Sequence, residues 1–161
     1  MTRFLFAIVA GLTFSAAPFA QAQSQAQTPV SGEPVWLTSL SQAQQQAQAT
    51  GRPVLAVFSG SDWCKPCIML KQEVFDQPEF ARFAQDKFVL ARFDFPRNKK
   101  HRLPAEQTRL NEQAAAQLDK QGEFPLVVVL SPKGQVLAHS SYRPGGPAAF
   151  DAYLQQVLAK K

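Results

Sequence analysis

Residues 53–67 read PVLAVFSGSDWCKPC, and this stretch decides both the fold and the chemistry that the sequence predicts. Its first half, Pro53 to Ser59, is a nearly continuous apolar run, which is typical of a strand buried on both faces of a sheet. Its second half holds the two cysteines of the chain, Cys64 and Cys67. A C-x-x-C motif at the point where a buried strand turns into a helix is a candidate redox site.

The position of the motif predicts a different role for each cysteine. At the first turn of a helix the backbone N–H groups have no intrahelical partner, so near Cys64 they favour thiolate over thiol. We therefore expect Cys64 to be the nucleophile. Cys67 lies one helical turn further on and deeper, where it can resolve the mixed disulfide that Cys64 forms. Pro66 fits an early helical position, Lys65 adds positive charge beside the thiolate, and Trp63 shields it.

Two other interpretations of the cysteines stay open at this stage. A C-x-x-C pair can be half of a zinc site, but the rest of the chain offers only His101 and His139, without the short spacing of a zinc finger. The pair could also form a purely structural disulfide. A bridge that closes so short a loop constrains the unfolded chain very little, so it would stabilise the fold poorly.

The rest of the chain predicts alternating helices and strands around this motif. In order, we expect a helix from Ser39 or Ser41 to about Ala49, the strand 53–59, a helix from Cys64 to about Glu73, a second helical piece from Pro78 capped by Asp76 or Gln77, strand 88–95, helix 104–120, strands 126–130 and 135–140, and a terminal helix after residues 145–147. The last two strands form a hairpin. This order predicts an α/β protein with a central mixed sheet of about four strands and helices on both faces.

The amino-terminal residues carry the three parts of a signal peptide. A short basic start is followed by the apolar run Phe4 to Phe14 and by a small-residue cleavage pattern that ends at Ala22. We expect cleavage there, a protein that is periplasmic or otherwise exported, and a mature form that does not span the membrane, because the run is too short. Residues 23–34, rich in Gln, Ala, Ser, Thr and Pro, are predicted to be a flexible linker, which leaves 35–161 as the folded domain.

Length and charge exclude several classes of protein. With 161 residues, 45% of them hydrophobic, the chain can bury the core of one domain. Two cysteines are too few for a disulfide-stapled miniprotein or a four-cysteine metal site. The net charge is +5, and the basic run from Arg97 to Arg102 is either a solvated loop or a docking patch for an acidic partner. Nucleic-acid binding is not expected.

The segment 58–67, followed by Leu70, Val74, Phe75 and Pro78, resembles the thioredoxin superfamily. It is most similar to exported thioredoxin-like proteins and to the periplasmic carboxy-terminal domain of the membrane thiol:disulfide interchange reductase. The resemblance covers about Trp36 to Leu158. It implies the thioredoxin fold, and a second match at residues 123–127 (EFPLV) implies that Pro125 is the family's cis-proline. In the family this proline faces the disulfide, and the backbone of the preceding residue, here Phe124, pairs with an extended substrate.

The sequence departs from that family at two positions. Thioredoxins proper carry a buried acid on the strand before the motif, where this chain has Ala56-Val57-Phe58. Asp62 or Glu73 could assist Cys67 instead only if the fold brings one of them close. The residue before the cis-proline is Phe124, whereas the family usually has a small or β-branched residue there.

Together these features predict an exported thiol:disulfide oxidoreductase that works as a disulfide reductase. Cys64 and Cys67 would be catalytic, and the substrate-binding residues would be Trp63, Lys65, Pro66, Phe124 and Pro125. No cofactor or metal is expected beyond the cysteine pair. The partners would be protein thiols or disulfides and an upstream thiol electron donor or acceptor, with the protein itself a monomer. The alternative is a binding module of the same fold, with a structural or vestigial disulfide, which the missing acid favours; a metal carrier is a third possibility.

Overall fold

The structure is a computed structural model that describes residues 34–160. The predicted signal peptide, residues 1–22, lies outside the described residues, as does all of the predicted linker except Pro34. Both stay predictions.

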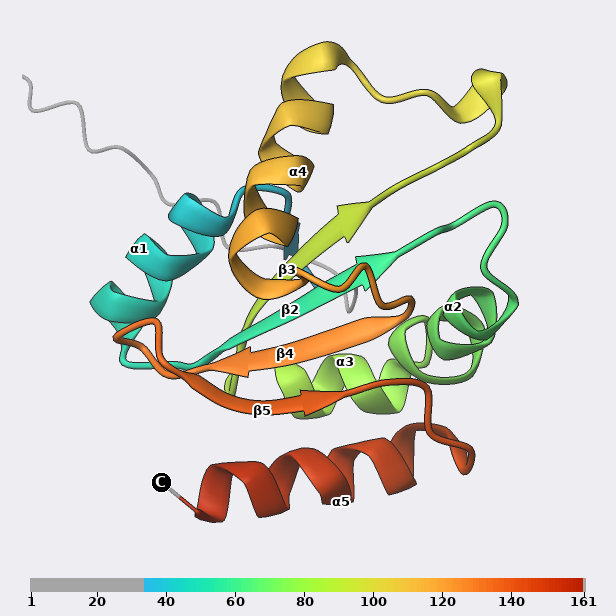
Figure 1. The fold of residues 1–161 in the computed structure, drawn as a ribbon. Helices are drawn as coiled ribbons and strands as arrows, with labels where there is room; N and C mark the ends of the chain where they lie inside the picture. The colour runs from blue at the N-terminus through green and yellow to red at the C-terminus, as the bar shows by residue number, and fades with distance from the viewer. Residues whose placement is uncertain (1–33, 161) are drawn as a thin grey trace, which may run out of the picture. The chain divides into compact units, whose positions relative to one another are not determined.

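The described residues form one mixed sheet with five strands (Figure 1). The strands are β1 (Trp36–Leu37), β2 (Val54–Ser59), β3 (Val89–Asp94), β4 (Leu126–Leu130) and β5 (Val136–Ser140), in the order β1-β3-β2-β4-β5. β3 runs parallel to β1 and β2, whereas β4 runs antiparallel to β2 and β5. The mixed sheet and the hairpin are confirmed. The expected number of about four strands was too low by the edge strand β1, whose two residues are too few to show the alternation of a strand.

Helices cover both faces of the sheet, as the order of elements predicted (Figure 1). One face is covered by α1 (Leu40–Thr50) and α4 (Ala105–Leu118), and the other by α2 (Lys65–Leu70), α3 (Pro78–Ala84) and α5 (Gly146–Ala159). The Ser39 side chain caps α1 by accepting a hydrogen bond from the Gln42 N–H, and Gly51 ends that helix at a φ of 69°.

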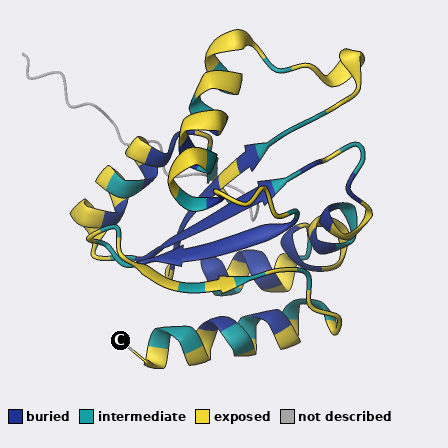
Figure 2. Cartoon of the chain, in the orientation of Figure 1, coloured by how far each residue is buried: buried dark blue, intermediate teal, exposed yellow. Residues whose placement is uncertain are grey.

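The strand before the cysteines supplies the centre of the core. Val54, Ala56 and Phe58 of β2 face α1 and α4, while Leu55 and Val57 face α2, α3 and α5. All five are at most 4% exposed, and β4 and most of β2 are dark blue in Figure 2. The apolar run therefore predicted a doubly covered strand correctly.

The helix after the cysteines differs from its prediction. A single helix to about Glu73 was expected, but α2 ends at Leu70 and the chain continues as a π-helical turn, η1 (Lys71–Phe75). The Asp76 N–H donates to the Lys71 carbonyl across five residues. Val74 and Phe75 are adjacent in sequence, and both are buried at this wider turn. Helical periodicity alone does not predict that both side chains pack into the core.

The topology brings three segments to one edge of the sheet. The parallel strands β2 and β3 end there, so the turn 60–63 and the loop 95–104 extend from the same edge (Figure 1). The antiparallel strand β4 begins there, which brings residues 124–125 to the same place. The cysteine pair, the basic run and the predicted cis-proline are therefore neighbours.

Candidate active site

The two cysteines form a disulfide at the start of α2. Cys64 is the N-cap residue of that helix, the Cα atoms of Cys64 and Cys67 are 5.2 Å apart, and the Cys67 N–H donates to the Cys64 Sγ at 3.3 Å. The two residues are almost equally buried, at 5% and 4% exposed, so burial separates them less than expected. Their surroundings differ: the Cys67 Sγ accepts a hydrogen bond from the Gly60 N–H at 3.5 Å and lines an inner pocket.

The peptide bond between Phe124 and Pro125 is cis, as the resemblance implied. Pro125 lines the same pocket as Cys67, and its carbonyl accepts a hydrogen bond from the Ser141 Oγ at 2.8 Å. No hydrogen bond joins the Phe124 backbone to another of residues 34–160. That backbone is therefore available to a further chain beside the disulfide.

Trp63 is held in place from several sides. Its Nε1–H donates to the Phe95 carbonyl at 2.7 Å, and its ring meets the Phe124 ring edge-on at 5.3 Å between centroids. Gly60 leaves room for the indole, because a Cβ at that position would lie 2.3 Å from the Trp63 Cε2 atom. The large side chain of Phe124, unusual before a cis-proline, is thus part of an aromatic cluster with Trp63 and Phe95.

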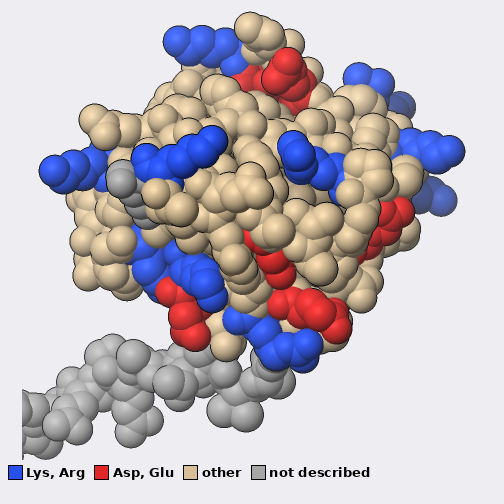
Figure 3. Space-filling view, turned by 90° about the horizontal axis from the view of Figure 1, so that it is seen from below, with Lys and Arg blue, Asp and Glu red and all other residues tan. Residues whose placement is uncertain are grey.

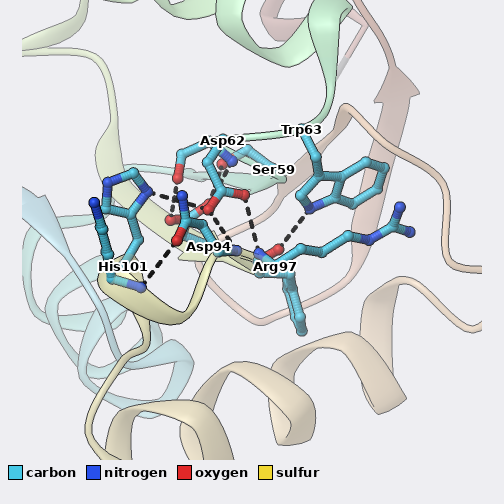
Figure 4. Close-up of polar contacts among 10 residues, drawn as sticks. Ser59, Asp62, Trp63, Asp94, Arg97 and His101 are labelled. Atoms are coloured by element: carbon cyan, nitrogen blue, oxygen red, sulfur yellow. Dashed lines mark hydrogen bonds and ion pairs between the residues drawn. The ribbon is translucent and has the colours of Figure 1, made fainter.

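The two acids suggested as substitutes for the missing one are bound elsewhere. Asp62 accepts hydrogen bonds from the Arg97 and Asn98 N–H groups, both at 2.9 Å, and lies 3.1 Å from the His101 Nδ1 (Figure 4). These contacts, the Arg97 N–H first, lower the pKa of Asp62. Glu73 accepts a hydrogen bond from the Tyr142 hydroxyl at 2.6 Å, which raises the pKa of Tyr142.

The inner pocket that Cys67 lines also borders the strand segment where thioredoxins carry their buried acid. It has a volume of about 260 Å³, and Val57 from the strand segment without an acid lines it together with Ser59. Arg92 of β3 also lines this pocket. Arg92 was not predicted as a site residue, because it belongs to a different strand and pairs with Val57 only through the parallel register of β2 and β3.

An acid that was not predicted from the sequence holds the active-site turn. Asp94, at the end of β3, accepts hydrogen bonds from the Ser61 N–H at 2.9 Å and the Ser61 Oγ at 2.6 Å. Its own carbonyl accepts one from the Nδ2 of Asn111, a residue of α4 that is 2% exposed. The turn before Cys64 is therefore fastened to the sheet and, through Asn111, to a helix.

The remaining predicted site residues lie at the rim. Lys65 and Pro66 occupy the first turn of α2 and are exposed. The basic run includes a short 3-10 helix, η2 (Lys99–His101). Arg97, the first residue of the run, reaches the site, because its guanidinium lies 3.6 Å from the Trp63 ring centroid. Figure 4 shows the Arg97 side chain extending along Trp63, with His101 on the other side of Asp62.

Residues 34–160 lack two features. Within that range no three His, Cys, Asp or Glu side chains come together as possible metal ligands. None of the helices described there is both long and apolar enough to cross a membrane.

Known proteins resemble the chain in sequence and in structure. The model of a family described as thioredoxin-like matches residues 35–132. A Chlamydia pneumoniae protein, disulfide bond reductase DsbH, is 30% identical over 130 residues, which are 81% of this chain and 76% of the relative. The solved structure of a DsbH oxidoreductase is 28% identical, with a TM-score of 0.73, and covers 88% of this chain and 97% of its own. A thioredoxin from Thermus thermophilus, 22% identical over 81% of this chain and 90% of its own, shares the fold with a TM-score of 0.60.

Proposed function

Because this chain belongs to the thioredoxin-like family and is a thiol:disulfide oxidoreductase, we propose that it acts as a disulfide reductase on exported proteins. The observation that carries the proposal is the Cys64–Cys67 disulfide at the start of α2, with cis-Pro125 lining the same pocket as Cys67. The similarity to a protein named disulfide bond reductase supports the direction of electron flow.

The reaction begins with the reduced pair. The Cys64 thiolate attacks one sulfur of the substrate disulfide, a new bond forms between the Cys64 Sγ and that sulfur, and the other substrate sulfur leaves as a thiolate that takes a proton. The Cys67 N–H that points at the Cys64 Sγ, and the positive charge of Lys65 nearby, both favour the thiolate form of Cys64.

The second step regenerates the disulfide seen in the structure. Cys67 loses its proton and attacks the Cys64 Sγ, which releases the second substrate sulfur and leaves the Cys64–Cys67 bond. Two electrons have then passed from the pair to the substrate. The proton of Cys67 passes to water at the inner pocket, which Cys67 lines.

The substrate lies across the cis-proline. The unpaired backbone of Phe124 pairs with an extended segment of the substrate, while Trp63 and Pro66 flank the reacting sulfurs. Each turnover oxidises the cysteine pair, so an upstream thiol donor must reduce it again. The signal-peptide pattern of residues 1–22 supports an exchange outside the cytoplasm. Sequencing of the mature amino terminus tests this, and the mature chain should begin at Gln23.

The test of this function is the reduction of insulin disulfides, with glutathione as the source of electrons. Cys64→Ser should reduce insulin at the uncatalysed rate. Cys67→Ser should also lose turnover. When it is reduced beforehand and mixed with insulin without glutathione, it should accumulate a mixed disulfide, because Cys64 still attacks and no second thiol resolves the product. The double variant is the matched control: the chain has no third cysteine, so no mixed disulfide should form.

A binding module would behave differently in the same experiment. It would show no turnover as the native chain, form no mixed disulfide in Cys67→Ser, and keep its partner in all three variants. That result would replace the reductase with the binding module.

A further inference from the structure

A groove lies on the side of Trp63 that faces α4. Its volume is about 660 Å³, and the aromatic side chains of Trp63, Phe95 and Phe124 line it. The Phe124 ring meets the other two edge-on, at 5.3 Å from Trp63 and 5.4 Å from Phe95 between centroids. Since Trp63 precedes Cys64 and Phe124 precedes cis-Pro125, a chain that crosses the disulfide can continue into this groove.

Arginine side chains from the loop 95–104 border the aromatic surface. Arg97 and Arg102 both line the groove, and neither is in an ion pair with another residue in the described part of the chain. Arg109 of α4 also lines the groove, but its guanidinium is paired with Glu106. Two cations beside the disulfide are therefore left to pair with a ligand.

Acidic side chains in the groove offset these cations only in part. The Asp94 carboxylate is occupied by the N–H and hydroxyl groups of Ser61, whereas Glu112 of α4 is exposed. The side of the molecule that carries α5 is different: Figure 3 shows its Lys and Arg side chains scattered, several of them beside Asp or Glu. The arginines of the loop differ from these in that they line an aromatic groove next to Trp63.

Asp62 holds this loop in place before any substrate arrives. Its carboxylate accepts the N–H groups of Arg97 and Asn98 and contacts His101, so the loop is fastened to the turn that carries Cys64 (Figure 4). The Arg97 guanidinium rests on the Trp63 ring at 3.6 Å. A cation that is already positioned loses little conformational freedom when it binds an anion.

We propose that this groove selects the substrate: it binds the segment that flanks the substrate disulfide and prefers segments with an apolar side chain and an Asp or Glu close to the reacting cysteine. The inference rests on the proposed function. The aromatic surface buries the apolar side chain, and Arg97 and Arg102 pair with the carboxylate, whose planar shape fits a guanidinium.

The test uses three disulfide peptides that differ only at one position near the cysteine, which is Glu, Gln or Lys. The measured quantity is the ratio of kcat/KM between peptides. For the native chain we expect the Glu peptide to be reduced about tenfold faster than the Lys peptide, with a smaller preference over Gln. The preference should shrink as ionic strength rises, because salt screens exposed charges.

Variants assign the preference to the groove. Arg97→Gln and Arg102→Gln should each bring the Glu-to-Gln ratio closer to one, and the double variant should remove the preference. Lys133→Gln is the matched control: it removes the same charge from an exposed position in the turn after β4, at the other end of that strand, so it should keep the native ratio.

Three results would overturn the inference. The first is that the native chain reduces the three peptides at equal rates. The second is that the arginine variants slow the reduction of all three peptides by the same factor. The third is that Lys133→Gln changes the Glu-to-Gln ratio as much as the arginine variants do. If the native chain reduces the Gln peptide but shows no preference for the Glu peptide, this inference fails and the proposed function stands. If none of the peptides is reduced, the proposed function fails and the inference fails with it.

Discussion

At the scale of single residues, the site depends on how Trp63 is packed. Its indole is fixed by the Phe95 carbonyl, by the Phe124 ring and by the Arg97 guanidinium. Gly60 completes this arrangement, because any Cβ there would overlap the indole at 2.3–2.6 Å. Gly60 also donates its N–H to the Cys67 Sγ, so one glycine touches both the tryptophan and the resolving cysteine.

Gly60→Ala should therefore displace Trp63 and slow the enzyme. We expect the Trp63 indole N–H to lose its protection from hydrogen exchange, kcat/KM to fall about tenfold, and the free energy of unfolding to fall by about 1–3 kcal/mol, the usual cost of overpacking. The measurements are NMR hydrogen exchange, insulin reduction and urea denaturation.

A double-mutant cycle shows whether the tryptophan causes the loss. In a Trp63→Ala background the added methyl group has room, so Gly60→Ala should cost little further stability. An equal cost in both backgrounds would mean that Gly60 is required for a different reason.

The residues of the redox motif could be predicted from sequence, whereas their supporting residues could not. Cys64 and Cys67 follow from a short motif with fixed spacing, whereas the cis-proline follows from the resemblance to the thioredoxin superfamily. Asp94 and Arg92 belong to β3, and their place at the site depends on its register with β2. Asp62 was considered as a substitute for the missing acid, but it fastens the loop instead.

At the scale of elements, the apolar runs predicted the strands β2 to β5, whereas β1 was missed. β2 and β4 were expected within one residue of their observed ends, since a buried strand needs an uninterrupted apolar run. β1 has two residues and owes its existence to pairing with β3, which is tertiary information. The π-helical turn η1 was missed for a similar reason, since its packing and not its composition sets it apart from α2.

The loop 95–104 is the element whose interpretation changed most. The sequence left it either a solvated loop or a docking patch. In the structure its backbone is bound to Asp62, and Arg97 covers Trp63. Charge alone could not distinguish a solvated loop from a docking patch, because the distinction depends on which residues the loop contacts in the fold.

At the scale of the whole molecule, α5 closes the face of the sheet that carries α2 and α3. Phe150 and Leu154 of α5 are fully buried, and the Phe150 ring lies 5.7 Å from the Phe75 ring. Asp151 is next to this contact. Its Oδ1 is buried without a hydrogen-bond partner in residues 34–160, and burial raises the pKa of Asp151 to about 6, although Lys87 opposes the shift.

The raised pKa of Asp151 predicts how stability changes with pH. The folded chain keeps this proton up to about pH 6, whereas the unfolded chain releases it near the ordinary value of 3.8. The contribution of Asp151 to stability is therefore greatest below about pH 4 and is lost as the pH rises towards 6. Asp151→Asn should raise the free energy of unfolding at pH 7 by about 1–2 kcal/mol and change it little at pH 4.

Urea denaturation at both pH values checks this expectation. Asp86→Asn is the control, since it makes the same change at an exposed carboxylate in the turn before β3. A gain of the same size at pH 4 and pH 7 would show that the Asp151 charge is not the cause.

The most direct test of the account as a whole is the equilibrium redox potential of the Cys64–Cys67 pair. It is obtained by incubating the protein in graded ratios of reduced and oxidised glutathione and alkylating the free thiols. A reductase is predicted to have a potential near −270 mV, about that of thioredoxin, so that its reduced form donates electrons readily. A potential near −120 mV, about that of a strong oxidant, would mean that the protein accepts electrons from its partners and would contradict the reductase.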